Sequence, residues 1–267
     1  MLSGRDRVLT GSNSMRFERY VAIGDSTSEG MDDPDGQGGY RGWANRLAER
    51  IAAQQGSLLY ANLAVRGRNS KQIREQQLAP ALAMRPDLAS VVAGTNDVLG
   101  RRFDARVFAA ELFAMQHALV ESGATVITFT LPDLAPVMPL ARLLGTRVLE
   151  LNAAIRESCT NSGAILCDLA AYPIASDPRL WSDDRLHANS IGHARIAEAL
   201  AYHLGLPDTD RSWAEPLPDL PRTTFADVVR AELAWGRRHL LPWVWRHLHG
   251  RSSGDGRGPK RPDLAPV

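Results

Sequence analysis

Short runs of continuous apolar residues alternate with longer amphipathic segments along most of this chain, and this alternation constrains its fold more than any other feature. The apolar runs predict strands at residues 19–24, 58–65, 88–93, 124–131 and 164–169. Helical periodicity predicts helices at residues 42–54, 70–82, 104–122, 143–159 and 190–204, with Pro80 disturbing the second of them. Strands that are apolar on both faces are typical of a parallel sheet covered by helices on both sides. The sequence therefore predicts a doubly wound, flavodoxin-like three-layer α/β sandwich with a five-stranded parallel sheet.

A serine follows the first predicted strand directly. The run Gly24-Asp25-Ser26-Thr27-Ser28 places Ser26 on a strand-to-loop corner, where we expect its hydroxyl to be exposed. In doubly wound sheets, functional residues collect at the carboxyl ends of the strands. A serine hydroxyl is a weak nucleophile unless a base removes its proton, so this interpretation requires a partner histidine elsewhere. The alternative role for Ser26 is the N-cap of the next helix.

The histidine that best fits this role lies far downstream, in the run Asp184-Arg185-Leu186-His187. The D-x-x-H spacing lets one loop carry both a base and the carboxylate that orients it. The chain has seven histidines, and among them His187 has a carboxylate at this spacing and a helix after it. His193, in that helix, is the fallback base, and Asp183 is the alternative orienting carboxylate.

Two further positions lie between these blocks, Gly67 in Asn62-Leu63-Ala64-Val65-Arg66-Gly67 and Asn96 in Gly94-Thr95-Asn96-Asp97. Taken together, the four blocks resemble the SGNH, or GDSL-type, hydrolases over residues 17–204, with Ser26, Gly67, Asn96 and His187 at the positions that name the family. The resemblance implies strand order 2-1-3-4-5 and an oxyanion hole formed by the N–H groups of Ser26 and Gly67 and the amide of Asn96. Considered singly, Gly67 and Asn96 could equally be turn residues.

The resemblance implies a serine hydrolase that cleaves carboxylic ester bonds through an acyl-enzyme on Ser26, with His187 as base and Asp184 as orienter. A small-molecule ester or acylated compound would be the substrate. A carbohydrate O-deacetylase, a thioesterase and a lysophospholipase stay open, because they would use the same residues. The non-enzymatic alternative is a membrane-surface or lipid-binding protein on a silent hydrolase fold. Nucleotide binding is disfavoured because neither phosphate-loop pattern follows a strand.

We expect no cofactor and no metal. Asp32, Asp33 and Asp35 cluster in the glycine-rich loop 30–42, which is either a lid or a solvated connection, but the calcium-loop pattern with its closing glutamate is absent. Cys159 and Cys167 lack metal-ligand spacing and are expected to be reduced and largely buried. A net charge of +1 gives the molecule no reason to bind nucleic acid. With no spanning apolar run and no signal peptide, the expected location is cytoplasmic.

Composition divides the chain into segments. Residues 17–206 form the hydrolase-like domain, and residues 1–16 are expected to be a disordered extension, within which Met15 is an alternative start. A proline-rich linker (207–222), an amphipathic helical segment rich in tryptophan and arginine (223–250) and a disordered tail (251–267) follow. Either Trp235, Trp243 and Trp245 pack on the domain, or this basic helix makes a weak peripheral contact with an anionic membrane.

Overall fold

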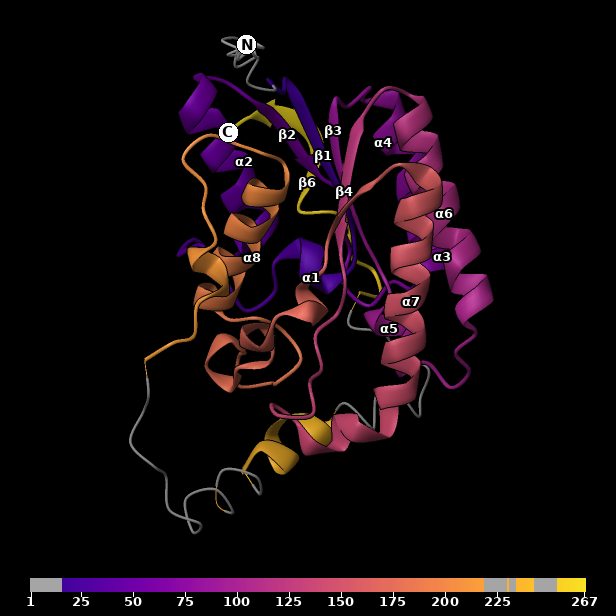
Figure 1. Cartoon of the computed structure of the whole chain (residues 1–267), viewed down its shortest axis with the longest axis vertical. Helices are drawn as coiled ribbons and strands as arrows, with labels where there is room; N and C mark the ends of the chain where they lie inside the picture. The colour runs from indigo at the N-terminus through magenta and orange to yellow at the C-terminus, as the bar shows by residue number, and fades with distance from the viewer. Residues whose placement is uncertain (1–15, 219–229, 231–233, 243–253) are drawn as a thin grey trace, which may run out of the picture.

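The computed structural model describes residues 16–218, 230, 234–242 and 254–267 of the chain (Figure 1). The prediction of a disordered extension at residues 1–16 therefore lies almost entirely outside the described residues. So does most of the predicted helical segment 223–250, including Trp243 and Trp245.

One sheet forms the centre of the molecule. Its strands are β1 (Arg19–Gly24), β2 (Leu59–Asn62), β3 (Leu88–Val92), β4 (Thr125–Phe129), β5 (Ile165–Cys167) and β6 (Arg261–Pro266), in the spatial order β5-β4-β3-β1-β2-β6. The first five are parallel, with β1 paired to both β2 and β3, and β6 is antiparallel to β2. The predicted parallel sheet and its order 2-1-3-4-5 are confirmed, and one further strand is added.

Helices cover both faces of the sheet, as the continuous apolar strands require (Figure 1). On one face, α2 (Gly42–Gln55) and α8 (Ser190–His203) pack on a cluster centred on Trp43, Tyr20 and Leu200. On the other face lie α3 (Ser70–Ile73), α4 (Ala79–Ala83), α6 (Ala105–Glu121) and α7 (Gly145–Ser162), around Val91, Phe108 and Met115. Two short helices, α1 (Ser26–Glu29) and α5 (Thr95–Leu99), begin just beyond the carboxyl ends of β1 and β3.

The helix predicted at residues 70–82 forms in three parts. A π-helical turn, Arg74–Leu78, separates α3 from α4, and Pro80 lies in the first turn of α4. Because proline lacks an N–H and its ring crowds the carbonyl four residues earlier, a regular α-helix cannot pass through it unchanged. The wider π turn accommodates the proline without ending the helix.

The prediction that residues 251–267 are disordered is wrong for residues 261–266, which form β6. The edge of β2 offers unpaired backbone groups, and an edge strand tolerates the prolines of this segment. Arg261 donates from Nε to the carbonyl oxygen of Tyr60 at 2.8 Å, and its guanidinium lies 5.4 Å from the centre of the Tyr60 ring. Lys260 Nζ donates to the carbonyl oxygens of Tyr40 and Arg41, both at 2.8 Å. Side-chain contacts to a distant edge thus order a segment of loop-like composition.

The described part of the predicted linker, residues 207–218, is also packed on the domain. Trp213 is 4% exposed, and its ring lies 4.6 Å from that of Tyr172. Arg195 donates to the carbonyl oxygens of Trp213 and Glu215 at 2.8 and 2.6 Å. The buried tryptophan ring and the contacts of Arg195 hold this segment against the domain, so it is not a free connection.

The two cysteines agree with the prediction, since Cys159 and Cys167 are both free and buried. Burial raises the pKa of the Cys159 thiol to about 11 and that of Cys167 to about 12, so both stay protonated. Within residues 16–218 and the described parts of the C-terminal segment, no helix is long and apolar enough to cross a membrane.

Removing residues 259–267 should destabilise the protein, because it deletes β6 and the contacts of Lys260 and Arg261. The loss of several hydrogen bonds and one cation–π contact, each about 1 kcal/mol, predicts a fall in Tm on the order of 10 °C by thermal denaturation. Asp263→Ala, at an exposed position of the same strand, is the control and should leave Tm unchanged. An unchanged Tm in the truncated protein would mean that β6 contributes nothing to stability.

Candidate active site

The turn after β1 holds Ser26 in a fixed position. Asp25, not Ser26, is the N-cap of α1, and its carboxylate accepts from the N–H of Thr27 at 3.0 Å. Gly24 leaves no room for a side chain, since a Cβ there would lie 2.5 Å from the carbonyl oxygen of Val92. The N-cap alternative for Ser26 is therefore wrong. Its hydroxyl is less exposed than predicted, because the residue is only 6% exposed.

Gln77, from the π turn, fixes the strand end from behind. Its Oε1 accepts from the N–H of Gly24 at 2.8 Å, and its Nε2 donates to the carbonyl oxygen of Gly24 at 2.9 Å. Gln77 is 3% exposed, so these bonds form in a site largely shielded from water. Both backbone groups of the residue two before Ser26 are thus satisfied by one side chain, which fixes the path of the turn.

His187 lies directly against Ser26. Its Nε2 is 2.8 Å from Ser26 Oγ, and its Nδ1 is 2.6 Å from Asp184 Oδ2. The other oxygen, Asp184 Oδ1, accepts from the N–H groups of Leu186 and His187 at 2.8 and 3.0 Å. The carboxylate is therefore held by its own loop while it orients the imidazole. Such a chain of contacts from carboxylate to imidazole to hydroxyl can remove the proton of the serine during attack.

The electrostatics of this cluster favour an ionised aspartate and a basic imidazole. Burial opposes ionisation of Asp184, but the hydrogen bonds and the charge of His187 hold its pKa well below the usual value. Burial also opposes protonation of His187, yet the hydrogen bond that His187 donates to Asp184 and the negative charges of Asp184, Asp32 and Asp25 raise its pKa above 6.5. A raised pKa makes the imidazole a stronger proton acceptor, which is what a general base requires.

His193, the fallback base, has other partners. His193 Nδ1 accepts from the N–H of Trp43 at 3.1 Å, and Nε2 lies 2.9 Å from the carbonyl oxygen of Met31. Burial lowers the pKa of His193 to about 4, so it is a neutral core residue that joins α8 to α2. The carboxylate in contact with His187 Nδ1 is that of Asp184, and the described contacts include none from Asp183 to this imidazole.

Asn96 and Gly67 lie beside the nucleophile turn, as the carboxyl-end argument predicts. Asn96 Nδ2 is 3.1 Å from Asp25 Oδ2 and 3.0 Å from the carbonyl oxygen of Arg68, so its amide bridges the residue before Ser26 and the residue after Gly67. Gly67 has a φ of +75°, which favours glycine. These contacts bring the two predicted oxyanion positions to the turn that carries Ser26.

The three aspartates of the glycine-rich loop have three different partners. Asp33 is 1% exposed and forms a two-pronged ion pair with Arg46 at 2.7 and 2.9 Å. Asp35 accepts from two N–H groups of its own loop. Asp32 reaches the loop that carries Asp184 and His187, where its Oδ2 lies 3.9 Å from His187 Nδ1. Asp32, Asp184 and His187 place donor atoms within 4.8 Å of one another, but a metal ion there would have to break the bond between Asp184 and His187.

An apolar pocket opens beside the serine. Thr27 and Thr95, the neighbours of Ser26 and Asn96, line this pocket. Leu186 lines it too, from the loop that carries Asp184 and His187, here called the histidine loop. The rest of the wall is largely aliphatic and aromatic, and includes Phe129, Leu131, Leu134, Met138, Ala141, Leu144, Val148, Leu169, Ile174, Leu180, Ile196 and Trp213. Its empty space amounts to about 1150 Å³, part of which is open to solvent. Such a wall suits a hydrocarbon chain rather than a hydroxylated one.

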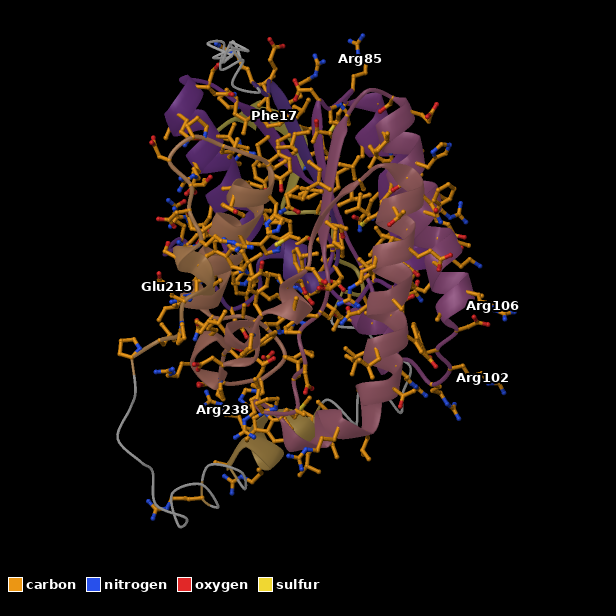
Figure 2. The ribbon with its side chains drawn as sticks, viewed as in Figure 1. Phe17, Arg85, Arg102, Arg106, Glu215 and Arg238 are labelled. Carbon is orange, nitrogen blue, oxygen red and sulfur yellow. The ribbon has the colours of Figure 1, made fainter. Side chains whose placement is uncertain are left out.

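The described part of the C-terminal helical segment contacts the histidine loop. Trp235 Nε1 donates to the carbonyl oxygen of Asp184 at 3.2 Å, and the Arg185 guanidinium lies 4.8 Å from the centre of a Trp235 ring. Figure 2 shows Arg238 at the end of the molecule opposite Phe17 and Arg85, which mark the amino ends of β1 and β3. The packing alternative thus holds for Trp235, and the membrane alternative gains no support.

Comparison with known proteins places the chain in a family. The model of the GDSL-like Lipase/Acylhydrolase family matches residues 22–195, which contain Ser26, Asp184 and His187. The chain belongs to this family. The match ends before the C-terminal residues that form β6 and contact the histidine loop. Membership of this family shows that the protein is an ester hydrolase. A comparison with curated proteins finds no match.

Solved structures of GDSL-like and related hydrolases share the fold. One is LAE5, an alpha/beta hydrolase enzyme from the metagenome of Lake Arreo, Spain, with 19% identity over 72% of this chain and 97% of its own, at a TM-score of 0.61. A lipase/acylhydrolase from Enterococcus faecalis has 22% identity over 70% of this chain and 95% of its own, at a TM-score of 0.58. An acetylxylan esterase from Geobacillus stearothermophilus has 15% identity over 75% of this chain and 97% of its own, at a TM-score of 0.57. At these identities the likeness concerns the fold.

Sequence reasoning missed three residues that support this site. Gln77 gave no signal, because its two bonds go to the backbone of a distant glycine. Ser182 lies two residues before Asp184 and bonds to it, a spacing that could have been noticed. Asp32 was considered only as a calcium ligand, although its position six residues after Ser26 places it near the same turn.

Proposed function

We propose that this member of the family is a serine esterase that hydrolyses carboxylic esters with an apolar acyl group, through an acyl-enzyme on Ser26. The observation that carries the proposal is the chain of two short contacts, 2.8 Å from Ser26 Oγ to His187 Nε2 and 2.6 Å from His187 Nδ1 to Asp184 Oδ2. A hydroxyl, an imidazole and a carboxylate in this order are what acyl transfer needs.

In the first half-reaction, His187 Nε2 accepts the proton of Ser26 as Oγ attacks the carbonyl carbon of the ester. The tetrahedral intermediate collapses, and the alcohol leaves with the proton that His187 returns. In the second half, a water molecule gives its proton to His187 and attacks the acyl carbon, which releases the acid and restores Ser26. Asp184 stays ionised throughout and stabilises the imidazolium, in agreement with its low pKa.

The oxyanion would be stabilised by the N–H groups of Ser26 and Gly67 and by Nδ2 of Asn96. The support for this assignment is that Asn96 bridges the residues adjoining Ser26 and Gly67. The bond of Asn96 to Asp25 would give way to the substrate oxygen. Donors fixed in this way act on the charge that develops in the transition state.

The apolar pocket supports an apolar acyl group on the substrate. Burial of one methylene contributes about 0.8 kcal/mol, so kcat/KM should rise roughly fourfold with each carbon added until the pocket is filled. Para-nitrophenyl esters from two to twelve carbons, assayed beside acetylated xylose, an acyl thioester and a lysophospholipid, test this. A rise from acetate to a medium chain supports the proposal. Highest activity on acetylated sugar would favour the deacetylase instead, and highest activity on the thioester or lysophospholipid would favour those alternatives.

A larger side chain in the pocket should shorten the preferred acyl group. Ala141 lines the pocket and is 9% exposed, so Ala141→Phe should place a ring in the pocket and reduce activity on long esters about tenfold, with acetate hydrolysis retained. Arg142→Phe adds the same ring at the exposed next residue and serves as the control. Equal loss on short and long esters in Ala141→Phe would show that the acyl chain lies elsewhere.

A further inference from the structure

We propose that Asp32 is a second carboxylate beside His187, which stabilises the protonated form of His187 together with Asp184. The inference deepens the proposed function and rests on it. The observation behind it is geometric. Asp32 Oδ2 lies 3.9 Å from His187 Nδ1 and 2.6 Å from Ser182 Oγ, and the same Ser182 Oγ lies 2.7 Å from Asp184 Oδ1. The two carboxylates therefore share one hydroxyl beside one imidazole.

The backbone before and after Asp32 fixes it in this place. Its φ is +67°, a left-handed conformation that aspartate and asparagine tolerate better than other residues with a side chain. Asp33 next to it is buried, paired to Arg46, and accepts from the N–H of Gly42 at 3.0 Å. The anchored Asp33 leaves Asp32 to point across to the histidine loop. The Asp32 side chain is 29% exposed, so its charge is only partly screened by water.

The proton count shows why the second carboxylate matters. Ser182 has one hydroxyl proton and can donate it to only one of the two carboxylates at a time. Asp184 Oδ1 already accepts two backbone N–H groups, so the hydroxyl of Ser182 is free to bond with Asp32. With neutral His187 the two negative charges repel each other. When His187 becomes an imidazolium, both attract it, so the pair favours the transition state over the resting state.

The other groups facing His187 determine how large the effect can be. Besides Asp184 on its own loop, they are Ser26 on α1, Asp25 at the end of β1, and His193 on α8, which senses the charge of His187. Asp32 also faces His187, and it comes from the loop between α1 and α2. It acts through His187 and does not contact Ser26, so it is a positioning residue rather than a catalytic one.

The test is the pH dependence of kcat/KM for a soluble para-nitrophenyl ester, in the full chain. Neutral His187 is the base, so kcat/KM falls as the pH drops through its pKa. Asp32→Asn removes a negative charge, destabilises the imidazolium and should move this acid limb to lower pH by on the order of half a unit. Asparagine keeps the left-handed backbone and the acceptor for Ser182. Asp35→Asn removes the same charge from the same loop and should leave the limb in place.

Comparing Asp32→Asn in two backgrounds gives a second readout that a purely structural role would not produce. In the wild type, Asp32→Asn should lower kcat/KM about threefold. With Asp184→Ala, where Asp32 is the remaining carboxylate, the same change should cost about tenfold or more, because coupled residues do not act additively. Equal losses in both backgrounds, together with an unmoved acid limb, would overturn the proposal.

Titration of His187 by NMR separates this inference from the proposed function. In the ¹⁵N-histidine-labelled protein, the pKa of His187 should be lower in Asp32→Asn than in the wild type, whatever reaction the enzyme catalyses. An unchanged pKa of His187 would overturn the role of Asp32 even if the ester hydrolysis on Ser26 stands. A lowered pKa beside activity that survives Ser26→Ala would support the coupling and contradict the esterase mechanism.

Discussion

Ser26→Ala should lower kcat/KM for ester hydrolysis by roughly 10⁴–10⁶-fold, because no other group in the site can form the acyl-enzyme. The change removes a single oxygen, which contacts His187 Nε2 at 2.8 Å. Alanine is also a better helix former than serine at the start of α1. The fold should therefore survive, and the measurement is the rate on a para-nitrophenyl ester beside a thermal melt of the same preparation.

The melt is the control for this prediction, and Tm should stay within a few degrees of the wild type. Ser28→Ala offers a matched comparison, since Ser28 is fully buried in the same short helix and its hydroxyl has no hydrogen-bond partner among the described residues. Activity that persists in Ser26→Ala at more than about a hundredth of the wild-type rate would contradict the assignment of the nucleophile.

His187→Ala should reduce kcat/KM nearly as much as Ser26→Ala. In the proposed mechanism the imidazole removes the proton of the serine, and without it the hydroxyl is a weak nucleophile at neutral pH. Since serine and histidine act as one unit, the double variant Ser26→Ala/His187→Ala should be no slower than the slower single variant. Steady-state rates of the two single variants and the double variant on one ester test this.

An exposed histidine provides the control for this pair. His117→Ala, on α6, lies outside the site and should keep wild-type rates. If the loss of kcat/KM in the double variant equals the product of the two single losses, Ser26 and His187 do not act as one unit. Independent residues would each contribute their own factor.

The core of the fold was predictable because it depends on local patterns. The continuous apolar runs that become β1, β3 and β4 leave few alternatives to a buried parallel sheet, and their order follows from the family resemblance. The contacts among Ser26, His187 and Asp184 were predictable for a similar reason. The serine follows a strand, and Asp184 and His187 share a loop at a spacing that brings their side chains together.

The remaining features depend on contacts between distant segments, which a single sequence does not reveal. β6 forms because Arg261 and Lys260 meet the β2 edge and the carbonyl oxygens before α2, some two hundred residues away in the chain. Its own composition, rich in proline and arginine, indicated disorder. The burial of Ser26 arises in the same way, since His187 covers it from a loop 161 residues later.

The same limit explains why the surroundings of the site were missed. Asp32 and Ser182 lie 150 residues apart, and only the folded loops bring them together. The contact of Trp235 with the carbonyl oxygen of Asp184 likewise joins two segments without any shared pattern. The sequence thus pointed to a charged or aromatic loop residue as a possible functional residue, but it did not reveal which distant residue it contacts.

Covalent labelling tests the central claim most directly. A fluorophosphonate should react with the native protein at one serine, and mass spectrometry of the digested protein should locate the adduct on Ser26. Labelling should be absent in Ser26→Ala and much slower in His187→Ala, because the reagent needs the activated hydroxyl. An adduct on another serine, or labelling that is unaffected by loss of Ser26, would contradict the proposed mechanism.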